Sequence, residues 1–162
     1  MKNGQSTIIS IDCGTQSLRV IIFAEEGSLL AKKQIMYKPC VSPRPGWAEQ
    51  DPAVWWGALC TGTAALKASH PDLIARAKGI GVTAQRDTVI LIDKDGNVLR
   101  PAITWLDTRK ARGRYHPNFI MKAALKAVDY YEKIIHSQSD GQCNWIQENE
   151  PEIWKKTWRV LM

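Results

Sequence analysis

Apolar positions cluster into three segments within the first forty residues, and the spacing of each segment predicts a β-strand. Residues 7–12 are rich in isoleucine, residues 18–23 are almost entirely apolar, and residues 29–36 continue the pattern after a polar turn. A short polar segment with one glycine, residues 12–17, separates the first two strands. We therefore expect a strand, a tight polar turn and a second strand at the start of the chain.

The pattern changes to helical spacing after a proline-containing loop. Asp51 is placed to cap a helix that has Pro52 at its first position. The helical spacing continues to about residue 67, and His70-Pro71 is expected to end it. Further strands are expected at residues 80–83, 88–92 and 98–103, and further helical segments at 118–135, 143–149 and 152–161. Strands followed by alternating helices and strands predict an α/β domain with a mixed sheet.

The composition is typical of a single folded domain. Of 162 residues, 44% are hydrophobic and 23% are charged, which is enough apolar material for a core without a disulfide or metal. The four cysteines and three histidines are dispersed without a Cys-x-x-Cys pair, so we expect reduced thiols and no cysteine–histidine metal site. Ser10 and Asp12 interrupt the first apolar run, which is too short for a signal peptide or a membrane span. These features predict a cytoplasmic protein without a membrane partner.

The chain is basic, with 22 Lys and Arg residues against 16 Asp and Glu residues and a net charge of +6. Such an excess is compatible with nucleic acid, an anionic membrane or a phosphorylated ligand as a partner. The positive residues are spread along the chain, apart from modest groups at residues 109–114 and 155–159. Because nucleic-acid binding needs clustered positive charge, we do not expect a nucleic-acid partner.

The polar turn between the first two strands contains residues suited to phosphate. It reads Asp12-Cys13-Gly14-Thr15-Gln16-Ser17-Leu18-Arg19. Glycine in a tight turn lets backbone N–H groups approach a phosphate, the Thr15 and Ser17 hydroxyls add donors, and Arg19 can contact an anion. Asp12, at a strand end, suits a hydrated Mg²⁺. On spacing alone, an ordinary β-turn with polar tips is the alternative.

Two later segments contain residues suited to a sugar or polyol. Gln85, Arg86 and Asp87 lie between two predicted strands, where the Arg–Asp pair offers donors and an acceptor to hydroxyl groups that both donate and accept. Trp105 lies two residues before Asp107, and an indole face can stack on the apolar side of a sugar. Taken singly, a surface salt bridge and a core tryptophan are the more common interpretations of these segments.

These three segments, together with the run Pro45-Gly46-Trp47-Ala48-Glu49-Gln50-Asp51-Pro52, resemble in their order the FGGY family of carbohydrate kinases. The resemblance covers most of the chain and is closer to glycerol kinases than to xylulokinases. The first motif recurs across the wider actin-like ATPase superfamily, whereas the Gly-Trp-x-Glu-x-Asp-Pro, Gln-Arg-Asp and Trp-x-Asp-x-Arg motifs are much more specific. The resemblance implies a ribonuclease-H-like, actin-type α/β fold, and an enzyme that transfers the γ-phosphoryl group of ATP to a sugar or polyol hydroxyl with Mg²⁺.

The resemblance also implies roles for individual residues. Contacts with the nucleotide phosphates would come from Asp12, Gly14, Thr15, Gln16, Ser17 and Arg19. The metal would bind at Asp12. Contacts with the sugar or polyol would come from Gln85, Arg86, Asp87, Trp105 and Asp107, with Trp105 packed on its carbon side.

Two departures from the family pattern bear on substrate specificity. Asp87 stands where glycerol kinases have a glutamate, so its carboxylate lies deeper and leaves room for a larger sugar. Ser137 aligns with a tyrosine that contacts the substrate in glycerol kinases. Both departures argue against glycerol as the substrate.

The resemblance further implies that residues 1–162 are the amino-terminal part of a longer enzyme. The family's general-base aspartate and most of its adenine-binding surface come later in the sequence, so no catalytic residue is assigned within this chain. We expect the chain to be inactive alone. Apolar residues at an unfinished edge, Trp154, Trp158 and Leu161, would favour self-association into a homo-oligomer.

Two alternatives come from other classes of protein. A non-catalytic sugar-binding or regulatory relative would keep Arg86 and Asp87 but would not need the phosphate loop, and the intact Asp12-x-Gly14-Thr15 sequence argues against it. A nucleic-acid-binding domain is suggested only by the charge. Affinity that falls steeply with salt would support that domain.

Overall fold

The computed structural model describes residues 5–162, which divide into two compact units. Unit 1 comprises the chain up to Cys40 and Gln50–Arg86, and unit 2 comprises Val41–Glu49 and Asp87–Met162. Each unit has a hydrophobic core of its own.

Unit 1 is built on a four-stranded sheet with the strand order β3-β2-β1-β5. Its strands are β1 (Thr7–Cys13), β2 (Ser17–Ala24), β3 (Leu29–Met36) and β5 (Ala77–Ala84). The first three strands pair antiparallel along the chain, whereas β1 and β5 pair in parallel. The predicted mixed sheet is therefore confirmed, and the turn between β1 and β2 is the segment expected to bind phosphate.

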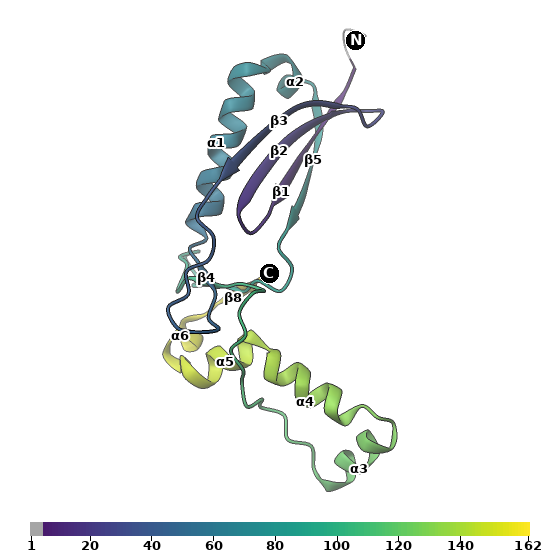
Figure 1. Ribbon diagram of the computed structural model, residues 1–162, viewed down its shortest axis with the longest axis vertical. Helices are drawn as coiled ribbons and strands as arrows, with labels where there is room; N and C mark the ends of the chain where they lie inside the picture. The colour runs from purple at the N-terminus through teal and green to yellow at the C-terminus, as the bar shows by residue number, and fades with distance from the viewer. Residues whose placement is uncertain (1–4) are drawn as a thin grey trace. The chain divides into compact units, whose positions relative to one another are not determined.

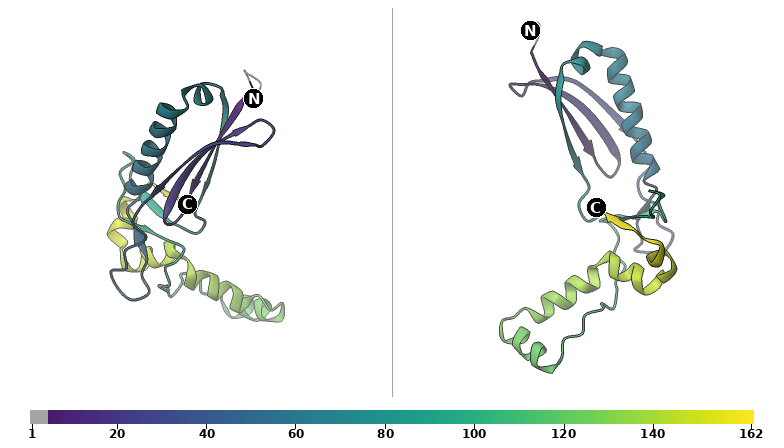
Figure 2. Two further views of the ribbon diagram at one scale, coloured as in Figure 1. Left: turned by 45° about the horizontal axis from the view of Figure 1, so that its top comes forward. Right: turned by 180° about the vertical axis from the view of Figure 1, so that it is seen from behind.

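The long helix α1 (Ala53–Ser69) covers one face of this sheet, as two views of the ribbon show (Figures 1 and 2). Its buried residues Ala58 and Leu66 pack with the buried isoleucines of β1 and β2 and with Val20. Helix and sheet approach closely at Gly62, where an added Cβ would lie 3.0 Å from Val20 Cγ2. The shared apolar face of helix and strands thus supplies the core of unit 1.

The ends of α1 differ slightly from the prediction. Pro52 occupies the cap position, and the Asp51 carboxylate accepts a hydrogen bond from the Ala53 amide at 2.9 Å, so Asp51 still satisfies one N–H of the first turn. The chain then forms a second, short helix, α2 (Pro71–Ala75), which was not predicted. Pro71 ends α1 as expected, but it also stands at the first position of the next helix, where proline is well accommodated.

Unit 2 combines short strand pairs with helices. The strands β6 (Ile90–Ile92) and β8 (Arg159–Leu161) pair antiparallel, and β4 (Glu49–Gln50) pairs with β7 (Ala102–Ile103). The helices are α3 (Phe119–Ala127), α4 (Tyr131–Asp140), α5 (Gln142–Asn149) and α6 (Pro151–Lys156). The core of this unit joins Val89, Leu91 and Ile103 to Trp145 and Ile146 of α5.

Two predictions for the last third of the chain are wrong. The helical pattern at residues 118–135 is divided between α3 and α4, because Asp129 adopts a left-handed conformation with a φ of 56°. The pattern at 152–161 is helical only to Lys156. Beyond it, the Trp158 amide donates to the Ile92 carbonyl at 2.8 Å and β8 begins.

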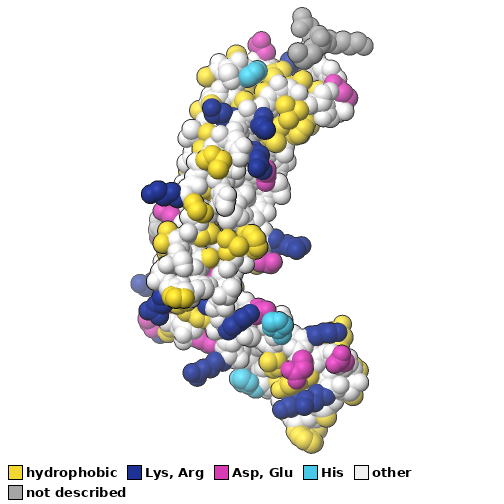
Figure 3. Space-filling view, viewed as in Figure 1, with side chains coloured by type: hydrophobic (Ala, Val, Ile, Leu, Met, Phe, Trp, Pro, Cys, Tyr) yellow, Lys and Arg dark blue, Asp and Glu magenta, His cyan; other side chains and the backbone are white. Residues whose placement is uncertain are grey.

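Large hydrophobic side chains are exposed on unit 2. Trp158 and Leu161 are exposed, as expected, whereas Trp154 packs against the core. Phe119 and Ile120 of α3 are exposed at 87% and 78%, and hydrophobic side chains are visible on the α3–α4 hairpin beside lysines (Figure 3). Across residues 5–162, no helix has both the length and the apolar character needed to cross a bilayer.

Candidate functional site

The turn between β1 and β2 is closed by an ion pair across the two strands. Asp12 faces Arg19 in the antiparallel register, and Arg19 Nη1 lies 2.7 Å from Asp12 Oδ2. The two side chains are 36% and 43% exposed, so both charged groups remain open to solvent and to an incoming ligand. The residues expected to bind a metal and a phosphate thus lie side by side, where the inner strands β1 and β2 meet the turn.

Glycine is needed for the tightness of this turn. The Gly14 amide donates to the Ser17 carbonyl at 3.0 Å, and a Cβ at Gly14 would lie only 3.2 Å from that carbonyl oxygen. Ser17 is buried, and its hydroxyl accepts a hydrogen bond from Gln34 Nε2 at 2.9 Å. Gln16 is exposed on the turn, whereas Ser17 lies beneath it and helps to hold it on β3.

Two side chains from outside the turn also fasten its backbone. Gln85 Nε2 donates to the Gly14 carbonyl at 3.2 Å, and Gln85 Oε1 lies 3.5 Å from the Thr15 hydroxyl. The Tyr37 hydroxyl donates to the same Gly14 carbonyl. Gln85 was expected to contact the sugar, but the structure places its side chain against the phosphate turn.

Burial around the turn changes the acidity of two groups. Partial burial raises the pKa of the Cys13 thiol above its ordinary value, and the neighbouring negative charge of Asp12 acts in the same direction. Burial also raises the pKa of Tyr37, with Cys13 as the next largest influence. Both groups therefore stay protonated at neutral pH, and Tyr37 remains the donor to Gly14.

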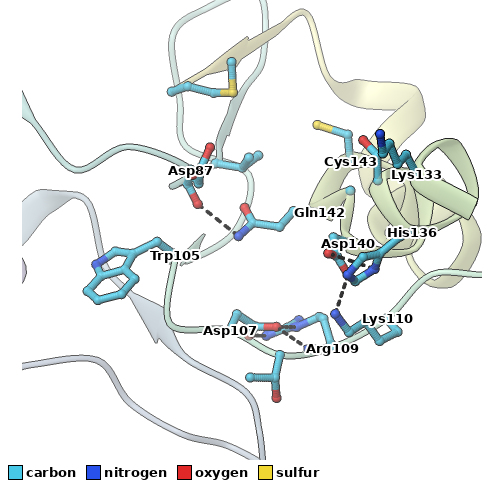
Figure 4. A pocket seen from close by; sticks show the side chains of 15 residues that line it. Asp87, Trp105, Asp107, Arg109, Lys110, Lys133, His136, Asp140, Gln142 and Cys143 are labelled. Carbon is cyan, nitrogen blue, oxygen red and sulfur yellow. Dashed lines mark hydrogen bonds and ion pairs between the residues drawn. The ribbon is translucent and has the colours of Figure 1, made fainter. Parts of the chain in front are cut away.

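A cavity of about 810 Å³ lies within unit 2 (Figure 4). Two residues expected at the sugar site, Asp87 and Trp105, are in its wall, and so is Ser137. Arg86 is exposed and belongs to unit 1. The cavity therefore collects part of the expected sugar site within a single unit.

The backbone of Asp87 has an unusual conformation. Its φ is 59°, in the left-handed region that non-glycine residues seldom occupy. Gln142, the first residue of α5, donates from Nε2 to the Asp87 carbonyl at 3.0 Å and to the Thr104 carbonyl at 3.1 Å. Figure 4 shows the Gln142 side chain extending toward Asp87.

Asp107 is turned into the protein. Its side chain has no exposed surface, and its two oxygens accept bonds from the amides of Ala48 and Arg109, at 2.7 and 2.9 Å, and from the Arg109 guanidinium. Arg109 in turn lies 2.8 Å from the buried carboxylate of Glu49, which also pairs with Arg100. Asp107 was expected to contact the substrate, but its hydrogen-bonding capacity is taken up by this internal network.

Several residues of the cavity had no sequence signal. His136 and Asp140 lie one turn apart on α4 with a 3.3 Å contact, and Asp140 also pairs with Lys110 (Figure 4). Gln142 follows at the start of α5. None of these residues belongs to a recognisable motif, and tertiary structure alone brings them to Asp87. Within residues 5–162, no three His, Cys, Asp or Glu side chains cluster as metal ligands.

The sequence matches the family model described as FGGY family of carbohydrate kinases, N-terminal domain, over residues 7–162. The chain belongs to the FGGY family of carbohydrate kinases, as its motifs had predicted.

Curated relatives include kinases for two substrates. The chain is 42% identical to the xylulose kinase of Klebsiella pneumoniae, a match that covers 95% of this chain and 31% of the relative. It is 38% identical to the glycerol kinase of Verminephrobacter eiseniae, over 89% of this chain and 28% of the relative. The chain therefore spans about a third of the length of these relatives, and it is similar to kinases of both kinds.

Solved structures confirm the predicted fold class. A xyloylose kinase from Brucella ovis superposes with a TM-score of 0.76 at 30% identity, covering 96% of this chain and 32% of that one. The xylulose kinase from Rhodospirillum rubrum gives 0.74 at 30% identity, covering 95% and 31%. The mixed α/β sheet of this chain is thus the amino-terminal architecture of actin-like carbohydrate kinases.

Proposed function

We propose that this chain is the amino-terminal part of an ATP-dependent kinase that phosphorylates a hydroxyl group of a sugar or polyol with Mg²⁺. The family match over residues 7–162 carries the proposal. The phosphate turn of unit 1 and the cavity of unit 2 support it, because each contains residues that the family motifs assign to one of the two substrates.

The Asp12–Arg19 pair suits a metal–nucleotide complex. Mg²⁺ prefers one or two carboxylates and several waters, so the single exposed carboxylate of Asp12 is a sufficient protein ligand. Asp12 would hold the cation, and Arg19 would then be free to donate to the phosphate oxygens. Bound Mg²⁺ would supply neutralisation of the charge that develops on the transferred phosphoryl group. Gln85 and Tyr37 would keep the Gly14 backbone in place during this exchange.

The cavity of unit 2 suits a polyhydroxyl ligand. The Asp87 carboxylate would accept from substrate hydroxyls, and the half-exposed indole of Trp105 would cover the carbon side. The assignment of Arg86 as a donor to these hydroxyls rests on the family motif alone. Asp107 would act indirectly, since its buried carboxylate holds the backbone of the same loop through Arg109. We assign Asp107 and Gln85 to positioning rather than to substrate contact.

A ketopentose is the first candidate substrate. Asp87 and Ser137 are smaller than the glutamate and tyrosine of the glycerol kinase pattern, and Ser137 lies in the cavity wall. The relatives described above include two xylulose kinases and a xyloylose kinase. We therefore expect xylulose to be a better substrate than glycerol.

A coupled assay of ADP release tests the proposal. It would compare the 162-residue chain with the full-length protein that contains it, across pentoses, hexoses and polyols. We expect sugar-dependent turnover from the full-length protein, with xylulose preferred, and none from the chain alone, because kinases of this type need closure around both substrates. A full-length protein without sugar-dependent ADP release would refute the kinase proposal. Sugar phosphorylation by the purified 162-residue chain would refute the prediction that this chain is inactive alone.

A further inference from the structure

The amide of Gln142 joins two segments of unit 2 that are distant in sequence. Its Nε2 atom donates to two backbone carbonyls, of Asp87 at 3.0 Å and of Thr104 at 3.1 Å. Carbonyl oxygens only accept hydrogen bonds, so the –NH₂ end of the amide must face both of them. The orientation of this side chain is therefore fixed by chemistry as well as by geometry.

The two carbonyls belong to the segments that carry the proposed sugar-binding side chains. One is the carbonyl of Asp87 itself, and the other immediately precedes Trp105. Thr104 is fully buried, and the Thr88 hydroxyl accepts a bond from the Trp105 amide at 3.3 Å, which links the same two segments a second time. The Gln142 bond also acts on the left-handed backbone of Asp87, a conformation that needs support from its surroundings.

Packing alone does not explain the choice of glutamine. Gln142 Oε1 is buried and has no hydrogen-bond partner among residues 5–162. A buried acceptor without a donor is unfavourable, and a methionine of similar shape would avoid that cost. The donors of the amide, rather than its volume or its oxygen, are therefore what this position requires.

We infer that Gln142 is a positioning residue for the sugar: it fixes the spacing between the Asp87 and Trp105 segments so that both side chains meet one ligand. This inference rests on the proposed function. Gln142 itself needs no contact with the substrate, and the nucleotide phosphates are assigned to unit 1.

Three substitutions in the full-length protein separate the donors from the rest of the side chain. Gln142→Met keeps the shape and removes both polar groups, Gln142→Glu keeps acceptors without donors, and Gln142→Lys keeps donors without an acceptor. Dissociation constants for xylulose and for ATP would be measured by calorimetry. Hydrogen exchange of residues 87–106 would be followed by mass spectrometry. Gln147→Met, on the same helix, is the matched control, since Gln147 accepts a hydrogen bond from the exposed Arg114 side chain.

We expect about tenfold weaker xylulose binding in the Met and Glu variants, with unchanged ATP binding and faster exchange confined to residues 87–106. The Lys variant should stay within about threefold of the parent, and Gln147→Met should match the parent. Parent-like xylulose binding and exchange in Gln142→Met would overturn the inference, as would a Lys variant as impaired as the Met variant. If the parent bound no sugar at all, the proposed function would fail, and the exchange rates of the three variants would still decide whether Gln142 holds the two segments.

Discussion

The guanidinium carbon of Arg109 lies 3.8 Å from the ring centre of Trp47 and 4.5 Å from that of Trp145. The two indoles meet edge to face, with their centres 5.2 Å apart. Arg109 also holds the carboxylates of Glu49 and Asp107, and its side chain is 2% exposed. Only a flat cation with several N–H groups can stack on two rings and bind two carboxylates together, so Arg109 organises the interior of unit 2.

We predict that Arg109→Lys destabilises unit 2 by about 3 kcal/mol, because a lysine ammonium cannot replace both the stacking and the paired bonds, and a buried carboxylate is left without its partner. Denaturant unfolding followed by tryptophan fluorescence measures this. The neighbouring Lys110→Arg change, at an exposed ion pair, should shift stability by less than about 0.5 kcal/mol. An Arg109→Lys protein as stable as the parent would show that the network contributes little.

Asp12→Asn tests the proposed metal site in the full-length protein. The amide oxygen can still accept from Arg19, so the turn should keep its conformation, but the charge that attracts Mg²⁺ is removed. We expect turnover to fall at least about tenfold at saturating Mg²⁺, whereas sugar affinity should change by less than about twofold. Glu25→Gln, an exposed change in the β2–β3 turn, is the control. Near-normal turnover in Asp12→Asn would mean that Asp12 serves only the turn.

Arg86→Ala tests the proposed sugar contact. Loss of the guanidinium would leave substrate hydroxyls without a donor, at a cost of about 1–3 kcal/mol in sugar binding, while ATP affinity should change little. Calorimetric titration of both ligands into the full-length protein measures the two effects separately. Lys94→Ala, in the exposed turn at residues 93–97, should alter neither affinity. If the Arg86→Ala variant lost ATP binding and kept sugar binding, Arg86 would have to be assigned to nucleotide binding instead.

The turn after β6 predicts a specific pH dependence. Hydrogen bonds from the Asn97 side chain and backbone lower the pKa of Asp93 below its usual value near 3.8, so the Asp93 charge stabilises the fold above that value. This stabilisation is lost as the pH falls through the lowered pKa. Asp93→Asn should therefore melt at a lower temperature than the parent at about pH 7, and the difference should shrink toward about pH 3.

The matched control for that experiment is Asp95→Asn. Asp95 is exposed in the same turn and contributes its backbone amide, rather than its carboxylate, to the bonds with Asp93. Thermal melts of both variants across the pH range should separate the two positions. A difference between Asp93→Asn and the parent that stayed constant with pH would contradict the electrostatic explanation.

Much of unit 1 could be predicted from the sequence. The limits of β3 agree with the predicted residues 29–36, and β1 and β2 differ from prediction by a residue or so at their ends. Their apolar patterns are local, and each pattern alone identifies a face that must be buried. The Asp93 turn is equally local, since its bonds join residues at most four positions apart.

The sequence motifs also identified the family and most residues of the two proposed sites, because those residues keep a fixed order along the chain. Tertiary structure decided what the side chains contact. Gln85 reaches back to Gly14, and Asp107 reaches the Ala48 amide, so both position backbone instead of facing a ligand. No local pattern encodes such partners, since a side chain bonds to whatever the folded chain brings within about 3 Å.

The last residues of the chain show most clearly what local sequence and tertiary structure each decide. The apolar spacing at residues 152–161 allows a helix, and α6 uses its first half. The second half becomes β8 because its backbone pairs antiparallel with β6, with Leu161 opposite Ile90 and Arg159 opposite Ile92. Local spacing determined which residues could be buried or helical. Long-range backbone pairing determined which of those conformations was adopted, because the hydrogen bonds of a strand form only when a second strand, distant in sequence, supplies their partners.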